Sequence, residues 1–433
     1  MEDIKVSVIM PMMNVKKYIR ECLDSVVKQT LKEIEILCVD AYSTDGSREI
    51  VEEYAKRDSR IRLINDEKGS TGYSNNMGIR LASGRYVAIL ETDDFIAPSM
   101  YETLYSIGEK ENCDVVKADY KVFWGDGKER IFLDKPIACG KEMYGRILSA
   151  KENKKIFLND MSTWAGLYKR SFLLGNQIWH NETPGASYQD NGFWFQVTAL
   201  AERMCYVPVS GYHYRLDNPG SSIHNPAKTF AICDEYSFIR KKLEEKRIFA
   251  EYCSIFVYMK YIRYISSFYR LHQDLKMQFL NRFSEEMRRH QEEKEIAWEM
   301  FSEMQKKILE AVLYSPEKFY DEIRQRQQAL SEFLEQEKKI IQAGCGSDGI
   351  RFLSYMKAHD RISQIVCIAD NNPKLHGKEI FHIPVVSPEQ ARETYGQYAY
   401  GYVITSLNHA SVIKDQLCSL GVPEKKIEIS YLC

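Results

Sequence analysis

The sequence predicts an α/β protein in which a Rossmann-like N-terminal domain is followed by an α-helical middle segment and a small C-terminal α/β domain with a Rossmann-like pattern. Three observations predict this class. Short β-branched runs alternate with amphipathic stretches up to about Lys117, no glycine occurs between Gly220 and Gly344, and the strand-like pattern returns at Lys338. With 433 residues, of which 44% are hydrophobic, the chain is long enough for two or three domains with separate cores. The predicted domains are residues 1–225, 226–336 and 337–433.

The N-terminal domain begins with four predicted strands separated by three predicted helices. The strands are short runs of β-branched and aromatic residues, and the helices carry apolar residues along one side. The strands are Val6–Met10, Ile36–Val39, Ile61–Ile64 and Tyr86–Leu90, and the helices are Val15–Thr30, Ser47–Arg57 and Tyr73–Leu81. This βαβαβαβ order is typical of a mostly parallel sheet covered by helices. The pattern from Asp114 to Asn225 is irregular, which indicates loops that complete a site.

The middle segment is predicted to be helical because it lacks glycine, is rich in Glu, Lys, Arg and Gln, and has proline only at Pro226 and Pro316. Apolar residues recur every three or four positions at Ile255, Tyr258, Ile262, Ile265 and Tyr269. Basic residues alternate with these aromatic side chains. Two interpretations stay open: the helix binds an anionic membrane surface, or it packs on the N-terminal domain with its charges solvated.

Charge and cysteine content narrow the class of partner. The 59 basic and 61 acidic side chains give a net charge of -2, so the chain lacks the positive field that holds nucleic acid. The eleven cysteines include no CxxC pair and are interpreted as reduced thiols. No signal-peptide pattern and no apolar run of bilayer length occur. We expect a cytoplasmic protein that is either soluble or bound at the inner face of the membrane.

Carboxylates follow two of the predicted strands. Asp40 comes after the second strand, and Glu91, Asp93 and Asp94 come after the fourth. In an open parallel sheet, ligands bind beyond the carboxyl ends of the strands. The first strand is followed by Pro11–Asn14 rather than by a glycine-rich phosphate loop, so a bound nucleotide would have its phosphates neutralised by a divalent metal. The alternative is that these acids cap turns and are solvated.

Several motifs within residues 4–225 occur in the order that is typical of one enzyme family. These motifs are Val6–Asn14 with Tyr18, Cys38–Asp40 with Ser43–Ser47, Asn76-x-Gly78, Ala82-x-Gly84-x-Tyr86, Leu90–Asp94, Trp164–Phe172, Gln189–Asp190 and Tyr212–Ser222. Together they resemble the bacterial family 2 glycosyltransferases, which have the GT-A fold. The chain departs from the family pattern at Ala41–Tyr42, Asn75, Glu91 and Gln189.

The resemblance implies that a sugar is transferred from a nucleotide diphosphate donor to an acceptor hydroxyl, with Mn2+ or Mg2+ as cofactor. By this resemblance, Pro11 and Asp40 contact the base, and Glu91 approaches the ribose. The residues implied in nucleotide-sugar binding are Pro11, Asn14, Asp40, Asn76, Glu91, Thr92, Asp93, Trp164 and Arg215. The implied metal ligands are Asp93, Asp94 and His224.

Asp190 is the general base that the resemblance implies. A carboxylate can remove the proton of an acceptor hydroxyl, and from the face opposite the leaving group it would invert the anomeric configuration. Asp also caps helices, and the pattern of Asn191–Ala201 predicts a helix, so an N-cap is the alternative. Trp164 is predicted either to stack on the sugar or to belong to the core. Arg215 is predicted either to pair with the diphosphate or to form a surface salt bridge.

The C-terminal domain has a glycine pattern of its own. Gly344-x-Gly346-x-x-Gly349 follows a predicted strand, and Asp370 follows the next strand, Ile365–Ala369. This spacing favours a nucleotide- or sugar-binding accessory domain, with these four residues as its ligand site, and a purely structural domain is the alternative. The section also resembles the small Rossmann-like domains attached to bacterial polysaccharide enzymes.

These observations predict a metal-dependent, inverting glycosyltransferase of bacterial polysaccharide or glycoconjugate synthesis. The expected partners are a nucleotide-sugar donor, above all a UDP-sugar, and a glycan or lipid-linked acceptor, together with a peripheral membrane contact and a second copy of the chain. A non-catalytic nucleotide-sugar-binding or scaffold protein is the first alternative, because several family motifs are altered. A nicotinamide-dependent enzyme working through Gly344 to Asp370 is the last.

Overall fold

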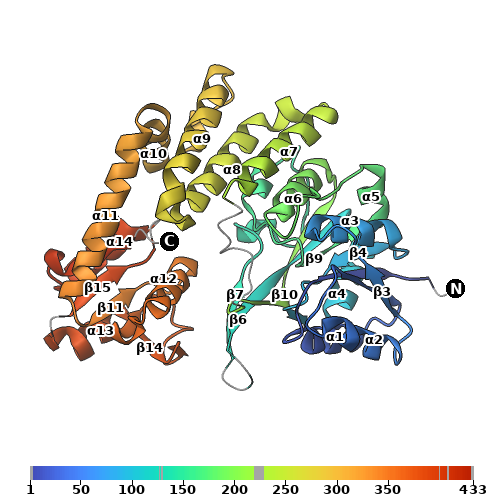
Figure 1. Cartoon of the computed structure of the whole chain (residues 1–433), viewed down its shortest axis with the longest axis horizontal. Coiled ribbons are helices and arrows are strands. Elements are labelled where there is room, and N and C mark those ends of the chain that lie inside the picture. Colours follow the sequence, from blue (N-terminus) through green and yellow to red (C-terminus); the bar gives the residue numbers. More distant parts are fainter. Residues whose placement is uncertain are drawn as a thin grey trace. The chain divides into compact units, whose positions relative to one another are not determined.

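The computed structural model describes residues 3–125, 127, 130–218, 229–398, 400–406 and 409–430. The chain divides into two compact units, Met1–Met259 and Lys260–Cys433 (Figure 1). The described residues form a ten-stranded sheet in the first unit and a six-stranded sheet in the second. The predicted α/β class is therefore confirmed for both ends of the chain.

The first unit opens with the predicted alternation of strands and helices. Its elements are β1 (Val6–Met12), α1 (Ile19–Val27), β2 (Ile34–Asp40), α2 (Ser47–Ala55), β3 (Ile61–Asn65), α3 (Thr71–Leu81) and β4 (Tyr86–Ile89). Helix α1 begins later than the sequence predicts, because Asn14 has a left-handed backbone with φ 53° and the amide of Val15 donates to Ser47 Oγ at 2.8 Å. These residues form a loop that is tied to α2 rather than a first helical turn.

The section between Asp114 and Asn225, predicted to consist largely of loops, contains more regular structure than expected. The elements from β4 onward are β5 (Phe95–Ile96), α4 (Met100–Lys110), β6 (Val115–Trp124), β7 (Ile131–Lys135), β8 (Ile147–Leu148), β9 (Gly166–Lys169), α5 (Arg170–Gly175), α6 (Gln189–Leu200) and β10 (Met204–Arg215). Strand β10 has an irregularity between Val207 and Tyr212 where its register against β6 shifts. Such a shift breaks the alternation of buried and exposed residues that identifies a strand in a sequence.

The sheet of the first unit has the order β3-β2-β1-β4-β9-β6-β10-β5. Strands β3, β2, β1 and β4 run parallel, whereas β9 runs antiparallel to both β4 and β6. The chain moves from β1 outward to β3 and then returns to the other side of β1 as β4. The strand order therefore reverses between β1 and β4, which is where a ligand is expected in an open sheet of this type.

Two helices follow this sheet in the chain, α7 (Ala231–Glu245) and α8 (Phe249–Arg270). Helix α7 packs against α6, and the hydroxyl of Tyr252 on α8 donates to the carbonyl of Ala199 at 2.9 Å. The division between the two compact units falls inside α8, after Met259. The sequence predicts domain boundaries after residues 225 and 336. In the structure α7 belongs to the first unit, whereas the prediction puts it in a separate helical segment.

The second unit begins with helices, as predicted. After α8 come α9 (Gln273–Glu292), α10 (Glu303–Tyr314) and α11 (Pro316–Gln336). The aromatic side chains of Tyr261, Tyr264 and Phe268 on α8 are buried against these helices, with Tyr264 and Phe283 at 5.2 Å between ring centroids. This part of α8 therefore packs on the helices that follow it rather than on the N-terminal domain, and its Lys260 is buried rather than solvated. Among the described residues, no helix combines the length and the apolar character needed to cross a bilayer.

A buried polar network joins α8 to α9 in this unit. Lys260 Nζ lies 2.8 Å from Glu286 Oε2 and 2.9 Å from His290 Nε2, and the other ring nitrogen of His290 lies 2.5 Å from Glu295 Oε2. Both nitrogens of His290 thus have protein partners. Although His290, Glu293 and Glu295 are close enough to hold a metal ion, this arrangement is explained by the burial of the Lys260 ammonium, which needs acceptors.

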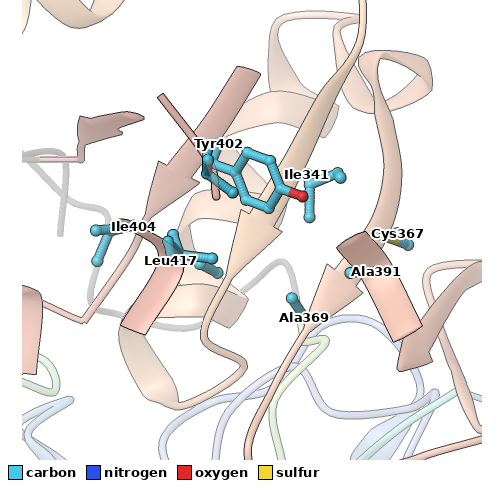
Figure 2. Packing of buried hydrophobic residues seen from close by; sticks show 9 residues of the cluster. Ile341, Cys367, Ala369, Ala391, Tyr402, Ile404 and Leu417 are labelled. Atoms are coloured by element: carbon cyan, nitrogen blue, oxygen red, sulfur yellow. The ribbon is translucent and has the colours of Figure 1, made fainter. Parts of the chain in front are cut away.

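The second unit ends in a six-stranded sheet of order β13-β14-β12-β11-β15-β16. Its elements are β11 (Ile340–Ala343), α12 (Ser347–Ala358), β12 (Ile365–Ala369), β13 (Glu379–Ile380), β14 (Ile383–Val386), α13 (Pro388–Tyr395), β15 (Gly401–Ile404), α14 (Ala410–Ser419) and β16 (Ile427–Ile429). All pairs are parallel except β13 with β14. Figure 2 shows the core of this sheet, where Ile341, Tyr402 and Leu417 pack together.

Candidate active site

The candidate site lies at the carboxyl ends of β1, β2 and β4. Pro11 is near the end of β1, Asp40 is the last residue of β2, and Glu91–Asp94 follow β4. Met12 pairs with Asp40 in the parallel register of β1 and β2, and Thr92 Oγ1 donates to the carbonyl of Pro11 at 3.1 Å. The predicted residues at these three strand ends are therefore brought together.

Asp40 is fully buried and holds the loop that follows β2. Its Oδ1 accepts the amide of Ser43 at 3.0 Å, and its Oδ2 pairs with Arg48 at 3.1 Å. Arg48 also donates to Asn65 Oδ1 at 2.9 Å, at the end of β3. The sequence reasoning missed Arg48, and its only signal was a basic residue at the start of a helix beside the Asp40 motif.

Asn14 links the loops after β1 and β2. Its amide donates to Ser43 Oγ at 2.9 Å, and its Oδ1 accepts the amide of Thr44 at 2.8 Å. Next to these contacts, Tyr42 has a left-handed backbone with φ 56°, and 60% of its surface is exposed. The side-chain oxygen of Asn14 is thus engaged within the protein, while an exposed aromatic ring stands beside Asp40.

The acidic loop, defined as Glu91–Asp94, is held by β10. Asp94 is buried, and its two carboxylate oxygens accept the hydroxyl of Tyr212 at 2.8 Å and the amide of Arg215 at 2.7 Å. The same Tyr212 hydroxyl accepts the amide of Glu91 at 3.1 Å. Asp93 is only partly buried, and its Oδ2 accepts an amide hydrogen of Asn218 at 2.7 Å. These hydrogen bonds favour Asp93 over Asp94 as the carboxylate that can bind a metal.

Arg215 is buried and donates a hydrogen bond to the backbone of the acidic loop. The alternative that it forms a surface salt bridge is therefore wrong. Only 2% of its side chain is exposed, and its Nε donates to the carbonyl of Asp93 at 3.1 Å. The guanidinium also pairs with Glu21 at 3.2 Å and with Asp217 at 3.3 Å. A diphosphate contact by Arg215 stays a prediction, because these contacts already engage its guanidinium.

Asp190 lies in the first turn of α6, which begins at Gln189. The residue before the helix is Tyr188, with φ 59°, so the alternative of Asp190 as the N-cap is wrong. Asp190 Oδ1 accepts an amide hydrogen of Asn191 at 2.9 Å. The side-chain amide of Gln189 donates from Nε2 to the carbonyls of Thr183 and Gly185 at 3.2 and 2.9 Å, which a glutamate side chain could not do. The departure from the family pattern at Gln189 thus has a structural role in the loop before α6.

The charge of Asp190 acts on groups of the acidic loop, although the two are about a hundred residues apart in the chain. Burial, the Asp93 carboxylate and the Asp190 carboxylate raise the pKa of Glu91 to about 8. Burial raises the pKa of Tyr214, and Asp94, Asp93, Glu91 and Asp190 all contribute to the same shift. Several like charges therefore act on one another across a common space, as at a site that takes a cation.

The ring of Trp164 packs against two tyrosine rings of strand β10. Its ring stacks on Tyr212 at 4.2 Å and on Tyr214 at 5.0 Å between centroids, and it is partly exposed. Trp164 thus contacts Tyr212, the tyrosine whose hydroxyl holds the acidic loop. Both predicted roles, sugar stacking and core packing, fit a half-buried indole.

Asn76 makes hydrogen bonds to the segment that precedes α6. It is buried in α3, where its side chain accepts the amide of His180 at 2.9 Å and donates to the carbonyl of His180 at 3.0 Å. It also donates to Glu182 at 3.0 Å. Asn76 therefore holds the segment that leads to α6, and donor binding by Asn76 stays a prediction. His224, the third implied metal ligand, lies outside the described residues.

The predicted ligand residues of the second unit also come together. Gly344 has φ 101°, and a Cβ on Gly349 would lie 2.4 Å from the carbonyl oxygen of Gly344, so α12 approaches the loop closely. Gly346 directly precedes α12. Asp370 Oδ2 accepts the amide of Cys345 in that loop at 2.6 Å. Asp370 thus holds the loop itself, and its part in a nucleotide- or sugar-binding site stays a prediction.

Comparison with family models finds one match in each half of the chain. Residues 7–173 match the model of glycosyl transferase family 2, and residues 279–420 match the model of a C-methyltransferase C-terminal domain. The structure of S. aureus TarS in complex with UDP-GlcNAc has the same fold as the first unit, with a TM-score of 0.50 and 20% identity, and the match covers 65% of this chain and 80% of that one.

Two bacterial relatives match the first half of the sequence. The uncharacterized glycosyltransferase EpsJ of Bacillus subtilis is 32% identical over 229 residues, which are 52% of this chain and 64% of EpsJ. The glycosyltransferase GlyG of Streptococcus pneumoniae is 40% identical over 218 residues, which are 48% of this chain and 70% of GlyG. With the strand-end carboxylates and the reversal of strand order at the site, these matches show that the chain belongs to glycosyl transferase family 2.

Proposed function

We propose that the first unit catalyses metal-dependent transfer of a sugar from a UDP-sugar to an acceptor hydroxyl, with inversion at the anomeric carbon. The arrangement that supports this proposal is the acidic loop next to the carboxyl ends of β1 and β2, together with Asp190 in the first turn of α6, whose charge contributes to the raised pKa of Glu91. A polypeptide that only served as a scaffold would have no physical need to bring these carboxylates together.

The donor end of the site is assigned to the ends of β1 and β2. The family resemblance puts the nucleotide base next to Asp40, which is bound by Arg48 and is followed by the exposed Tyr42. UDP is the proposed nucleotide because the resemblance implies it, and TarS, a chain of the same fold, was solved with UDP-GlcNAc. The acceptor is proposed to be a glycan or a lipid-linked glycan.

Asp93 fits a divalent cation, because its carboxylate is partly exposed and oxygen is the ligand that Mn2+ and Mg2+ prefer. Such an ion would neutralise charge on the leaving diphosphate. Asp190 would accept the proton of the acceptor hydroxyl as the new bond forms. Its place in the first turn of a helix keeps its carboxyl at a fixed position relative to the acidic loop.

A thermal-shift panel tests the donor and metal parts of this proposal. UDP-, GDP-, CMP- and dTDP-sugars are added with and without Mn2+, and a ligand that binds the folded state raises the melting temperature. We expect a Mn2+-dependent rise with UDP-sugars that is lost in Asp93→Ala and kept in Asp415→Ala, which changes an exposed carboxylate on α14. The absence of a shift with every donor would contradict the proposal and favour the non-catalytic scaffold.

A further inference from the structure

A carboxylate from α7 lies against the first turn of α6. Glu235 is buried, with 1% of its surface exposed. Its Oε1 accepts the backbone amide of Gly192 at 2.8 Å, and its Oε2 accepts the side-chain amide of Asn181 at 2.9 Å. Glu235 thus supplies an acceptor for one of the backbone amides that the start of a helix leaves without a partner.

The glycine at position 192 is required by this contact. A Cβ at that position would lie 2.3 Å from Glu235 Oε1 and 2.9 Å from Phe238 Cδ1, both on α7. Glycine is unfavourable inside a helix, so its presence in α6 is explained by the close approach of the carboxylate. The carboxylate and the glycine are therefore two parts of one arrangement.

Glu235 also acts electrostatically on Asp190, which is two residues before Gly192. Burial raises the pKa of Glu235 to about 8, the hydrogen bonds from Asn181 and Gly192 oppose this rise, and the charge of Asp190 adds to it. A buried carboxyl group beside another carboxylate is costly for folding. An apolar side chain would have packed α7 on α6 without that cost.

We infer that Glu235 is a positioning residue for the proposed base Asp190, holding the first turn of α6 so that the Asp190 carboxyl faces the acidic loop. This inference rests on the proposed function of Asp190. It also assigns α7 to the catalytic unit, although the family model matched in this chain ends at residue 173. Asn181 belongs to the same arrangement, because its side-chain amide donates a hydrogen bond to Oε2 of Glu235.

The test compares substitutions at Glu235 with one that breaks a different hydrogen bond to the same helix. Glu235→Ala removes the acceptor, Glu235→Asp withdraws it by one methylene, and Glu235→Gln keeps an acceptor oxygen for Gly192. Tyr252→Phe is the matched control, because it removes the bond from α8 to the Ala199 carbonyl at the other end of α6. UDP release from UDP-GlcNAc, UDP-glucose and UDP-galactose with Mn2+ is measured in the full chain without an added glycan, so that water accepts the sugar and one free sugar forms for each UDP released. The best donor gives kcat and KM.

We expect Glu235→Ala and Glu235→Asp to lower kcat about tenfold or more, with KM for the donor within about threefold of the wild type. Glu235→Gln is expected to recover kcat to within about threefold of the wild type, and Tyr252→Phe is expected to lower the melting temperature while kcat stays within about twofold. If Glu235→Ala does not fold, the contrast between Glu235→Asp and Glu235→Gln still decides the question. Equal kcat in those two variants would overturn the inference.

Asp190→Asn separates this inference from the proposed function. If Asp190→Asn turns over like the wild type, Asp190 is not the base, so the catalytic role given to it in the proposed function fails together with the inference about Glu235. If Asp190→Asn is inactive while Glu235→Ala and Glu235→Asp fold and keep the wild-type kcat, only the role of Glu235 fails. In the double variant Asp190→Asn/Glu235→Ala, we expect UDP release no lower than in Asp190→Asn alone, because Glu235 acts through Asp190. A further drop of about tenfold would show that Glu235 acts by another route.

Discussion

The hydroxyl of Tyr212 on β10 makes two hydrogen bonds to the acidic loop, and removing it tests how strongly these bonds hold the loop. Tyr212 is fully buried, and its hydroxyl donates to Asp94 Oδ2 at 2.8 Å and accepts the amide of Glu91 at 3.1 Å. Tyr212→Phe keeps the ring and its stacking on Trp164, at 4.2 Å between centroids, but removes both bonds. It therefore isolates the hydrogen bonds from the packing.

The expected loss of stability follows from the two groups that would be left without a partner. A buried polar group that loses its hydrogen bond costs about 1–3 kcal/mol. Asp94 keeps its bond to the Arg215 amide at 2.7 Å, so its part lies at the low end of this range. The two contributions together give about 2–4 kcal/mol of unfolding free energy for Tyr212→Phe.

Urea unfolding of the wild type and the variant measures this difference. Tyr101→Phe is the matched control, because Tyr101 is also fully buried but its hydroxyl has no hydrogen-bond partner among the described residues. We expect Tyr101→Phe to be neutral or slightly stabilising, since it removes a buried polar group that nothing satisfies. A loss below about 1 kcal/mol in Tyr212→Phe, or equal losses in the two variants, would refute the role of Tyr212 as a support of the acidic loop.

Two further predictions concern the surroundings of the site. Gly72→Ala would put a Cβ 1.9 Å from the carbonyl oxygen of Asn181, so we expect urea unfolding to show a loss of about 3 kcal/mol of unfolding free energy. Gly175→Ala is the control, because nothing lies within 4 Å of a Cβ there, and it is expected to change the unfolding free energy by less than about 1 kcal/mol. Equal losses in the two variants would contradict this packing. Burial opposes, but hydrogen bonds from Ser7 and Ser83 outweigh it, so the pKa of Glu35 lies below its ordinary value of 4.5. A carboxyl group whose pKa is lower in the folded than in the unfolded state stabilises the fold above its unfolded-state pKa, and this contribution is lost as the pH falls through the folded-state pKa. In Glu35→Gln the free energy of unfolding is therefore expected to fall less between about pH 7 and pH 3 than in the wild type. An unchanged pH dependence would contradict this prediction.

The parts of the fold that depend on local pattern could be predicted from the sequence. Strands such as β2 (Ile34–Asp40) are buried on both faces and therefore contain a run of consecutive apolar residues, here Ile36–Val39. The meeting of Asp40 with the acidic loop could also be predicted, because the carboxyl ends of parallel strands share one edge of a sheet. The GT-A fold and the glycosyltransferase family followed from the order of these motifs.

The contacts that decide the role of each side chain could not be predicted, because their partners lie far away in the chain. The bonds of Asp94 to Tyr212 and Arg215, about 120 residues later, were not foreseen, and metal binding by Asp94 stays a prediction. Asn76 was expected at the donor, yet it binds His180, about a hundred residues later. Glu235 gave no signal at all, since a lone acid in a charged helix is ordinary in a sequence. Tertiary contacts of this kind depend on how helices pack, which a single sequence does not specify.

UDP release by the full chain with Mn2+ and a panel of UDP-sugars, compared between the wild type and Asp190→Asn, tests the proposed chemistry most directly. The wild type is expected to release UDP from one of these donors. Asp190→Asn is expected to lose about a hundredfold or more of this rate, because it lacks the base, while the donor still raises its melting temperature. Turnover of Asp190→Asn at the wild-type rate would contradict the proposal that Asp190 and the acidic loop form the catalytic centre.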